Sequence, residues 1–210
     1  MRKSVYSLVL SDEVVAAVDR VAYEHCTSRS NMINQILAEY VSYVTPEKRM
    51  RAVLDETRGL LMGSGIFQLM MQPSESIMAL RSALAYKYNP TVRYSIELYR
   101  NTEGGRLGEL KVSLRSQNQT LLIYLNEFFK LWIQIEDKLL SPAPDYRLEN
   151  GRYTRILRLP ADSQTGASES IASYIRLFDS CLKTYFALLD TPQAAMSRII
   201  AEYQSYLQTN

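Results

Sequence analysis

The sequence contains a single histidine, His25, among its 210 residues. Histidine is the most frequent general base in enzymes and the commonest side-chain ligand for transition metals. A catalytic triad would therefore have to use His25, which lies at the end of a predicted helix with no acidic or nucleophilic partner indicated. At that position an interaction with the negative end of the helix dipole is the more economical role.

Cysteine is almost as scarce. Cys26 and Cys181 are far apart and match no CxxC or zinc-ligand spacing, so we interpret them as small hydrophobic residues in a reducing compartment. Gly104-Gly105 is predicted to be a turn, because no GxGxxG or GxxxxGK[ST] motif surrounds it. These absences together predict a protein that is not an enzyme, with no catalytic residues, no metal site and no cofactor.

Long hydrophobic runs are also missing. The most apolar segment, Thr120–Ile135, contains Asn126, Glu127 and Lys130, whereas a membrane span needs roughly 20 predominantly apolar residues. Serines and acidic residues interrupt the N-terminal segment, so no signal peptide is predicted. We expect a cytoplasmic protein without a membrane partner.

The chain has no large excess of charge of either sign. Its formal net charge is +2, and residues 1–50 contain six basic and six acidic side chains. Charge alone therefore does not predict a nucleic-acid partner, and any such contact must come from a local arrangement. Hydrophobic residues make up 47% and charged residues 22% of the chain, which is typical of a folded globular protein.

A short strand followed by two amphipathic helices is predicted at the N-terminus. Residues 4–10 consist largely of strand-forming side chains, and Ser11 is a suitable cap for a helix that runs to about His25. Ser28 can cap a second helix, which ends before Pro46. The apolar positions of the two helices have the spacing of a buried face; they are Val14, Val15, Val18, Val21, Ala22, Met32, Ile33, Ile36, Leu37, Tyr40 and Val41.

A single short strand is not a stable sheet by itself, because its backbone groups and its apolar face need a partner. The economical solution is a two-fold homodimer in which the strands of two chains pair antiparallel above the four helices. We therefore predict that residues 1–45 form a dimerisation module.

Residues 46–210 are predicted to form a second, larger α+β domain, so that the chain as a whole is mainly α with an α+β part. A hairpin is expected between Val92–Arg100 and Leu107–Arg115, where apolar and polar residues alternate. A third strand is expected at Tyr153–Leu159 and a polar loop at Asp162–Ala167. Helices are expected over Pro46–Met71, Ser74–Tyr86, Gln119–Leu140, Ser170–Leu189 and Pro192–Leu207. The tyrosines of this part either line a ligand cavity or form a half-buried core.

Residues 4–43 resemble the ribbon-helix-helix family of the Arc, MetJ and CopG repressors. The resemblance depends on the order of a short strand, Leu10-Ser11-Asp12-Glu13, a helix, Thr27-Ser28-Arg29-Ser30 and an apolar helix. It covers about a fifth of the chain, and the remainder resembles no family that we can name. The sequence departs from the family where Cys26 replaces the usual glycine before the second helix.

The resemblance implies that the paired strands enter the major groove of double-stranded DNA. The outward side chains of the ribbon, which would contact base edges, are Lys3, Val5, Ser7 and Val9. The N-terminus of the second helix, with Ser28, Arg29 and Ser30, would contact phosphate. The implied function is that of a dimeric transcriptional regulator, most simply a repressor.

Two other functions remain open at this point. One is the antitoxin of a toxin–antitoxin pair that uses the same DNA module, and the other is an interaction protein that keeps the dimer fold without binding DNA. For the C-terminal domain the sequence favours control of the DNA module, through a small-molecule or protein effector or through higher oligomers.

Overall fold

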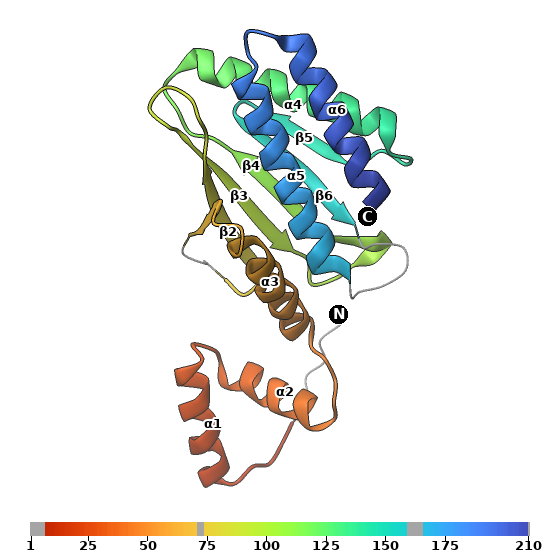
Figure 1. Cartoon of the computed structure of the whole chain (residues 1–210). Coiled ribbons are helices and arrows are strands. Elements are labelled where there is room, and N and C mark those ends of the chain that lie inside the picture. The colour runs from red at the N-terminus through yellow and green to blue at the C-terminus, as the bar shows by residue number, and fades with distance from the viewer. Residues whose placement is uncertain (1–6, 71–73, 159–165, 210) are drawn as a thin grey trace. The chain divides into compact units, whose positions relative to one another are not determined.

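The computed structural model describes residues 7–70, 74–158 and 166–209 (Figure 1). The chain divides into two compact units, Met1–Arg49 and Met50–Asn210. The domain boundary predicted at residues 45–46 coincides with the start of helix α3 (Pro46–Met62), and the two units divide near the N-terminus of that helix.

The first unit contains α1 (Asp12–Glu24) and α2 (Arg29–Tyr40). Both helices lie where the capping serines and apolar spacing predicted them. Its core is small: Val18, Ala22 and Met32 are buried together, with Ile33 packed against them.

The second unit is built on one six-stranded sheet. Its strands are β1 (Phe67–Leu69), β2 (Ile77–Ala83), β3 (Thr91–Leu98), β4 (Arg106–Ser113), β5 (Tyr146–Glu149) and β6 (Arg152–Arg158). They are arranged in the order β1-β2-β3-β4-β6-β5, and every neighbouring pair is antiparallel. The unit is therefore an α+β fold, as predicted.

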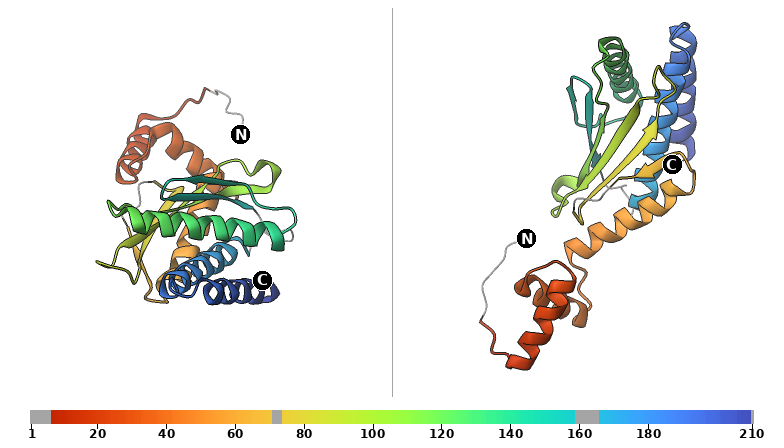
Figure 2. Two further views of the ribbon diagram at one scale, coloured as in Figure 1. Left: turned by 90° about the horizontal axis from the view of Figure 1, so that it is seen from above. Right: turned by 90° about the vertical axis from the view of Figure 1, so that its left-hand side faces the viewer.

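Helices cover one face of this sheet. They are α4 (Gln119–Leu139), α5 (Ala167–Ala187) and α6 (Pro192–Thr209), and α5 and α6 lie side by side in all three views (Figures 1 and 2). Phe178 of α5 connects the layers, with its ring centroid 5.0 Å from that of Trp132 on α4, 5.4 Å from Tyr153 on β6 and 6.3 Å from Tyr94 on β3. Large buried aromatic side chains of this kind dominate the energetics of a core.

The opposite face of the sheet carries mainly polar side chains. Burial alternates along β3, so that Val92, Tyr94 and Ile96 are buried while Arg93 is exposed and Ser95 half-buried. Successive residues of a strand point to opposite faces, so the buried set faces the helices and Arg93 and Ser95 face outward.

Two carboxylates are buried in the helix-covered core, and each has several polar partners. Asp179 accepts hydrogen bonds from Ser82, Tyr94 and Lys183. Glu136 accepts from Tyr153 and Tyr203, each at 3.0 Å. A buried carboxylate needs such partners, because an unpaired charge in the interior is costly.

The cation paired with Glu136 is Arg155. Its Nε atom lies 3.2 Å from Glu136 Oε1, while its guanidinium carbon lies 4.1 Å from the ring centroid of Tyr174. The Nε–H makes no hydrogen bond of good geometry, so this contact is an ion pair and not a directed hydrogen bond. Burial raises the pKa of Glu136, although Arg155 and the tyrosine hydroxyls act in the opposite direction.

The tyrosines on the helix-covered face belong to this core. Tyr94, Tyr153 and Tyr203 are almost completely buried, and their hydroxyls are hydrogen-bonded to the two carboxylates. The core interpretation therefore holds for these residues.

Several predicted elements of the second unit are confirmed. The hairpin is formed by β3 and β4, and its turn contains Gly104 and Gly105 at positive φ, a conformation that glycine adopts readily. Helices α4, α5 and α6 and strand β6 lie within a few residues of the predicted bounds. The predicted loop at Asp162–Ala167 lies mostly outside the described residues.

The predicted helix over Ser74–Tyr86 is wrong, because this segment contains β2. Met, Ala, Leu and Arg favour helices, but Met78, Leu80 and Ser82 alternate with Ala79 and Arg81, and pairing with β3 decides the conformation.

The predicted helix over Pro46–Met71 is too long. Helix α3 ends at Met62, since Gly63 and Ser64 loosen it and Gly65 has a φ of 67°. Strand β1 follows, and neither β1 nor β5 was predicted.

Among the described residues, no helix combines the length and the apolar character that crossing a bilayer requires.

Gly108 of β4 provides a test of the sheet. A Cβ atom at this position would overlap the backbone carbonyl of Glu97 and lie 2.9 Å from Leu98 Cα on the neighbouring strand. We expect Gly108→Ala to lower the free energy of unfolding by about 1–3 kcal/mol, the usual cost of overpacking. Chemical denaturation followed by the fluorescence of Trp132 measures it.

Gly59→Ala is the matched control, because a Cβ at Gly59 in α3 meets nothing within 4 Å. Alanine has a higher helix propensity than glycine, so Gly59→Ala should raise the free energy of unfolding by roughly 0.5–1 kcal/mol. Equal stability of the two variants would contradict the β3–β4 register.

Candidate nucleic-acid interface

The residues predicted to contact base edges lie only partly within the structure. Lys3 and Val5 lie outside the described residues. Ser7 and Val9 are exposed, and the relative exposure of Val9 is 102%. Residues 7–10 form no strand within the single chain. Because the predicted ribbon needs the backbone of a second chain, its pairing stays a prediction.

The end of this segment leads directly into α1. The Ser11 hydroxyl accepts a hydrogen bond from the backbone N–H of Val14 at 3.5 Å, and Asp12 and Glu13 occupy the first turn. A backbone N–H of the helix end and the Ser11 hydroxyl lower the pKa of Glu13. Carboxylates at this position stabilise the positive end of the helix dipole.

The N-terminus of α2 is built from the residues predicted to contact phosphate. Ser28 caps the helix, its hydroxyl accepting from the backbone N–H of Asn31 at 3.3 Å. The Asn31 side chain donates to the Thr27 hydroxyl at 2.8 Å, and Ser30 is exposed in the first turn. There is no acidic residue in this turn, so the positive end of the helix dipole is not compensated by its own side chains.

Arg29 has a partner that sequence reasoning missed. Its Nε and Nη2 atoms donate to the two carboxylate oxygens of Asp19 on α1, at 2.7 and 2.6 Å. This bidentate pair connects α1 to α2, and the hydrogen bond from Arg29 lowers the pKa of Asp19. A spacing of ten residues across a helix break gives no signal for it in the sequence, because such a pair depends on the angle between the helices.

The unit leaves most of its predicted apolar face uncovered. Val14, Val21, Ile36, Leu37 and Tyr40 belong to the predicted buried stripes, yet all five are exposed in the single chain. Twelve of the eighteen exposed large hydrophobic side chains in the described residues lie in this unit, although it is the smaller of the two. The excess of exposed apolar surface is therefore concentrated in the first unit.

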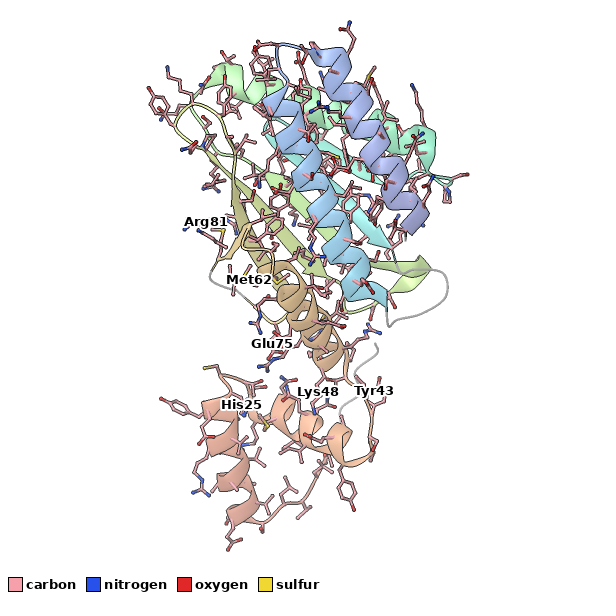
Figure 3. All side chains as sticks on the ribbon, viewed as in Figure 1. His25, Tyr43, Lys48, Met62, Glu75 and Arg81 are labelled. Carbon is pink, nitrogen blue, oxygen red and sulfur yellow. The ribbon has the colours of Figure 1, made fainter. Side chains whose placement is uncertain are left out.

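The described residues contain no group of three or more histidine, cysteine or acidic side chains that could hold a metal ion. Cys26 is exposed and Cys181 is buried, and burial raises the pKa of the Cys181 thiol. His25, labelled in Figure 3, is the C-cap of α1. Its backbone N–H donates to the carbonyl of Val21 at 3.0 Å, and the backbone N–H of Cys26 donates to that of Tyr23 at 3.1 Å.

The cap of α2 provides a direct test of this geometry. Ser28→Ala removes the hydroxyl that accepts from Asn31, and loss of an N-cap costs about 1 kcal/mol. We expect the amides of α2 to exchange with deuterium roughly fivefold faster, as measured by hydrogen-exchange mass spectrometry. Ser30→Ala is the matched control, since Ser30 lies in the same turn without a capping role. Similar exchange in both variants would show that the cap does not stabilise α2.

Comparisons of the chain with protein-family models, with curated proteins and with solved structures found no match.

Proposed function

We propose that the protein is a DNA-binding transcriptional regulator, most simply a repressor, that acts as a dimer through its first unit. The observation that carries the proposal is the arrangement of residues 7–40. An exposed segment of β-forming residues is followed by a capped helix, a break and a second capped helix, whose first turn has no acidic side chain. This is the order of elements in the ribbon-helix-helix family.

The small core of the first unit supports a dimer. Four side chains, Val18, Ala22, Met32 and Ile33, form its hydrophobic cluster. Folded units of about 40 residues rarely bury enough apolar surface alone, and they usually need disulfides, metals or oligomerisation. The unit has no disulfide, because its one cysteine, Cys26, is free.

The partner that best fits the exposed stripes is a second copy of the same chain. The uncovered side chains of α1 and α2 are those whose spacing predicts a buried face, and a two-fold axis places identical apolar faces against each other. The same axis pairs the two N-terminal segments antiparallel, which satisfies their backbone donors and acceptors.

Dimerisation through the N-terminal segment predicts a specific effect of proline. Ser7→Pro removes a backbone N–H from the middle of the ribbon in both protomers, so we expect the dimer dissociation constant to rise at least about tenfold. Sedimentation velocity of the full chain over a concentration series measures it.

Ser7→Ala keeps the backbone N–H and is the matched control, so its dimer should be as stable as that of the wild type. A wild-type chain that remains monomeric at micromolar concentration would contradict the dimer. An unchanged dissociation constant for Ser7→Pro would place the interface elsewhere.

In the proposed complex the ribbon reads the bases and α2 positions the module. Ser7 can exchange hydrogen bonds with a base edge, Val5 and Val9 can contact thymine methyl groups, and Lys3 can reach a guanine or a phosphate. The free backbone N–H groups at the start of α2, beside Ser28 and Ser30, suit a phosphate.

Arg29 has two separable roles in this proposal. Its bidentate pair with Asp19 joins the two helices, and its remaining donors can contact a phosphate beside the α2 N-terminus. Asp19→Asn weakens the pair but keeps the cation, whereas Arg29→Ala removes both. The two variants therefore distinguish a structural role from a contact with DNA.

We expect Arg29→Ala to weaken binding evenly across DNA sequences and to lower the slope of log K against log salt by about 1. Asp19→Asn should leave the slope unchanged. The measurement is fluorescence anisotropy with duplexes selected from a random pool, between 50 and 200 mM salt. Equal effects of both variants would assign Arg29 a structural role alone, and a wild-type chain that enriches no duplex and shows no salt dependence would overturn the DNA-binding function.

The role proposed for residues 46–210 is control of the DNA module through an effector or through assembly. The experiment compares the full chain with a fragment that ends near Val44, on DNA with one site and with two adjacent sites. Equal affinity, cooperativity and oligomeric state in both would remove this role.

A further inference from the structure

The face of the sheet opposite the helices contains a basic cavity in the second unit. Its volume is about 590 Å³. The residues that line it are Met70, Arg81, Thr91, Arg93, Ser95, Lys111, Ser113, Leu114, Arg115, Asn150, Gly151 and Arg152. Five of them are cationic and none is acidic. We call this cavity the basic groove.

The register of the sheet places the cations of the basic groove in rows. Arg81 on β2 is directly opposite Arg93 on β3, which is opposite Ser113 on β4, which in turn is opposite Arg152 on β6. In the adjacent row Ser95 is opposite Lys111. Directly opposite residues have Cβ atoms about 4.5–5.5 Å apart, so one row spans four strands within the reach of a small ligand.

The protein itself neutralises only part of this charge. Lys111 pairs with Glu97 and Glu109, and Arg152 pairs with Glu149 at 3.2 Å. Arg81 donates to the neutral side chain of Gln68 at 3.1 Å, and it extends from β2 away from α5 (Figure 3). Within the described part of the chain, Arg93 and Arg115 form no ion pair.

The Arg81–Arg93 pair is unfavourable for folding alone. Like charges directly opposite each other on neighbouring strands destabilise a sheet. Both side chains are exposed and lie on the polar face, so packing does not require arginine at either position. Sites that lower stability in this way are typical of binding functions, where a ligand supplies the missing interaction.

The lining also restricts the chemistry of the ligand. Arginine donates in pairs to the oxygens of phosphate, and Thr91, Ser95, Ser113 and Asn150 add neutral donors. No aromatic side chain lines the groove, so a nucleobase would find no ring for stacking. The volume lies within the range of small-molecule sites.

We propose that the basic groove is a binding site for a small anion that carries two or more phosphate groups. The arginines of β2, β3 and β6 bind separate phosphate groups, and the serine and threonine hydroxyls complete their coordination. This inference concerns the second unit alone and does not rest on the DNA-binding function.

Titration of the full chain with inorganic tripolyphosphate by calorimetry, at constant ionic strength, tests the site. We expect saturable binding at one site per chain and an increased melting temperature. Arg93→Gln should weaken binding at least about tenfold, since a charge-assisted partner is lost. The same variant should melt at a higher temperature than the wild type when no ligand is present, because the like-charge pair is relieved.

Arg198→Gln is the matched control, because Arg198 is exposed on α6, outside the groove lining, and its loss changes the net charge equally. Its affinity for tripolyphosphate should equal that of the wild type. Sulfate at the same ionic strength should bind much more weakly, since it offers a single group to the row of cations.

Three outcomes would overturn the proposal. One is the absence of saturable tripolyphosphate binding, and another is an equal loss of affinity in Arg93→Gln and Arg198→Gln. The third is weaker binding of duplex DNA by Arg93→Gln with no change for tripolyphosphate, which would assign the groove to nucleic acid. Loss of DNA binding by the first unit would leave the expected results unchanged.

Discussion

The alternation of side chains along a β-strand is the constraint on which the second unit depends. On β3 the buried Tyr94 stands next to Arg93, and on β6 the buried Tyr153 stands next to Arg152. The inward residues pack against Phe178 and hold the helices on one face. Their neighbours in the sequence are thereby fixed on the other face, so the packing that builds the core also assembles the basic groove.

The core in turn fixes the positions of the outward cations. Tyr94 and Tyr153 donate hydrogen bonds to the buried carboxylates of Asp179 and Glu136, so the inward side chains are held by both packing and polar contacts. A strand shift of one residue would move the tyrosines outward and the arginines into the core. The register is therefore strongly specified, and it fixes which side chains line the groove.

The first unit, in contrast, buries few apolar side chains, and this limits its stability as a single chain. Val18, Ala22 and Met32 are buried, but the remaining apolar positions of α1 and α2 have nothing to pack against in one chain. Its local structure is nonetheless well determined by short-range interactions, namely the serine caps and the Arg29–Asp19 pair. Local interactions define the helices, and a second copy supplies the missing hydrophobic contacts in our proposal.

Elements determined by short-range signals were predictable from the sequence. The helices that follow Ser11 and Ser28, and the β3–β4 hairpin with its Gly104-Gly105 turn, have local signatures of capping, periodicity and turn chemistry. Strand β2 has no such local signature, because its residues favour a helix and only pairing with β3 makes them a strand.

The candidate site residues also divide into those with a local sequence signal and those that depend on contacts distant in the sequence. Ser28 could be identified from the sequence, since an N-cap depends on its immediate neighbours. The pairing of Arg29 with Asp19 could not, and neither could the basic groove. The groove can be recognised only when the position of β2 and the register of four strands are known. The sequence prediction placed Arg81 on a helix and so separated it from the other cations.

Both candidate surfaces carry features that lower the stability of a single, unliganded chain. On the first unit the feature is exposed apolar area, and on the second it is the Arg81–Arg93 pair. A partner that binds only the folded state adds stability by mass action, about 2.7 kcal/mol at a concentration one hundred times its dissociation constant. For a domain whose total stability is on the order of 5–15 kcal/mol, a gain of that size offsets a substantial local cost. Surfaces that are unfavourable alone and favourable when occupied are therefore compatible with a stable fold, and each of our two proposals places a binding partner at such a surface.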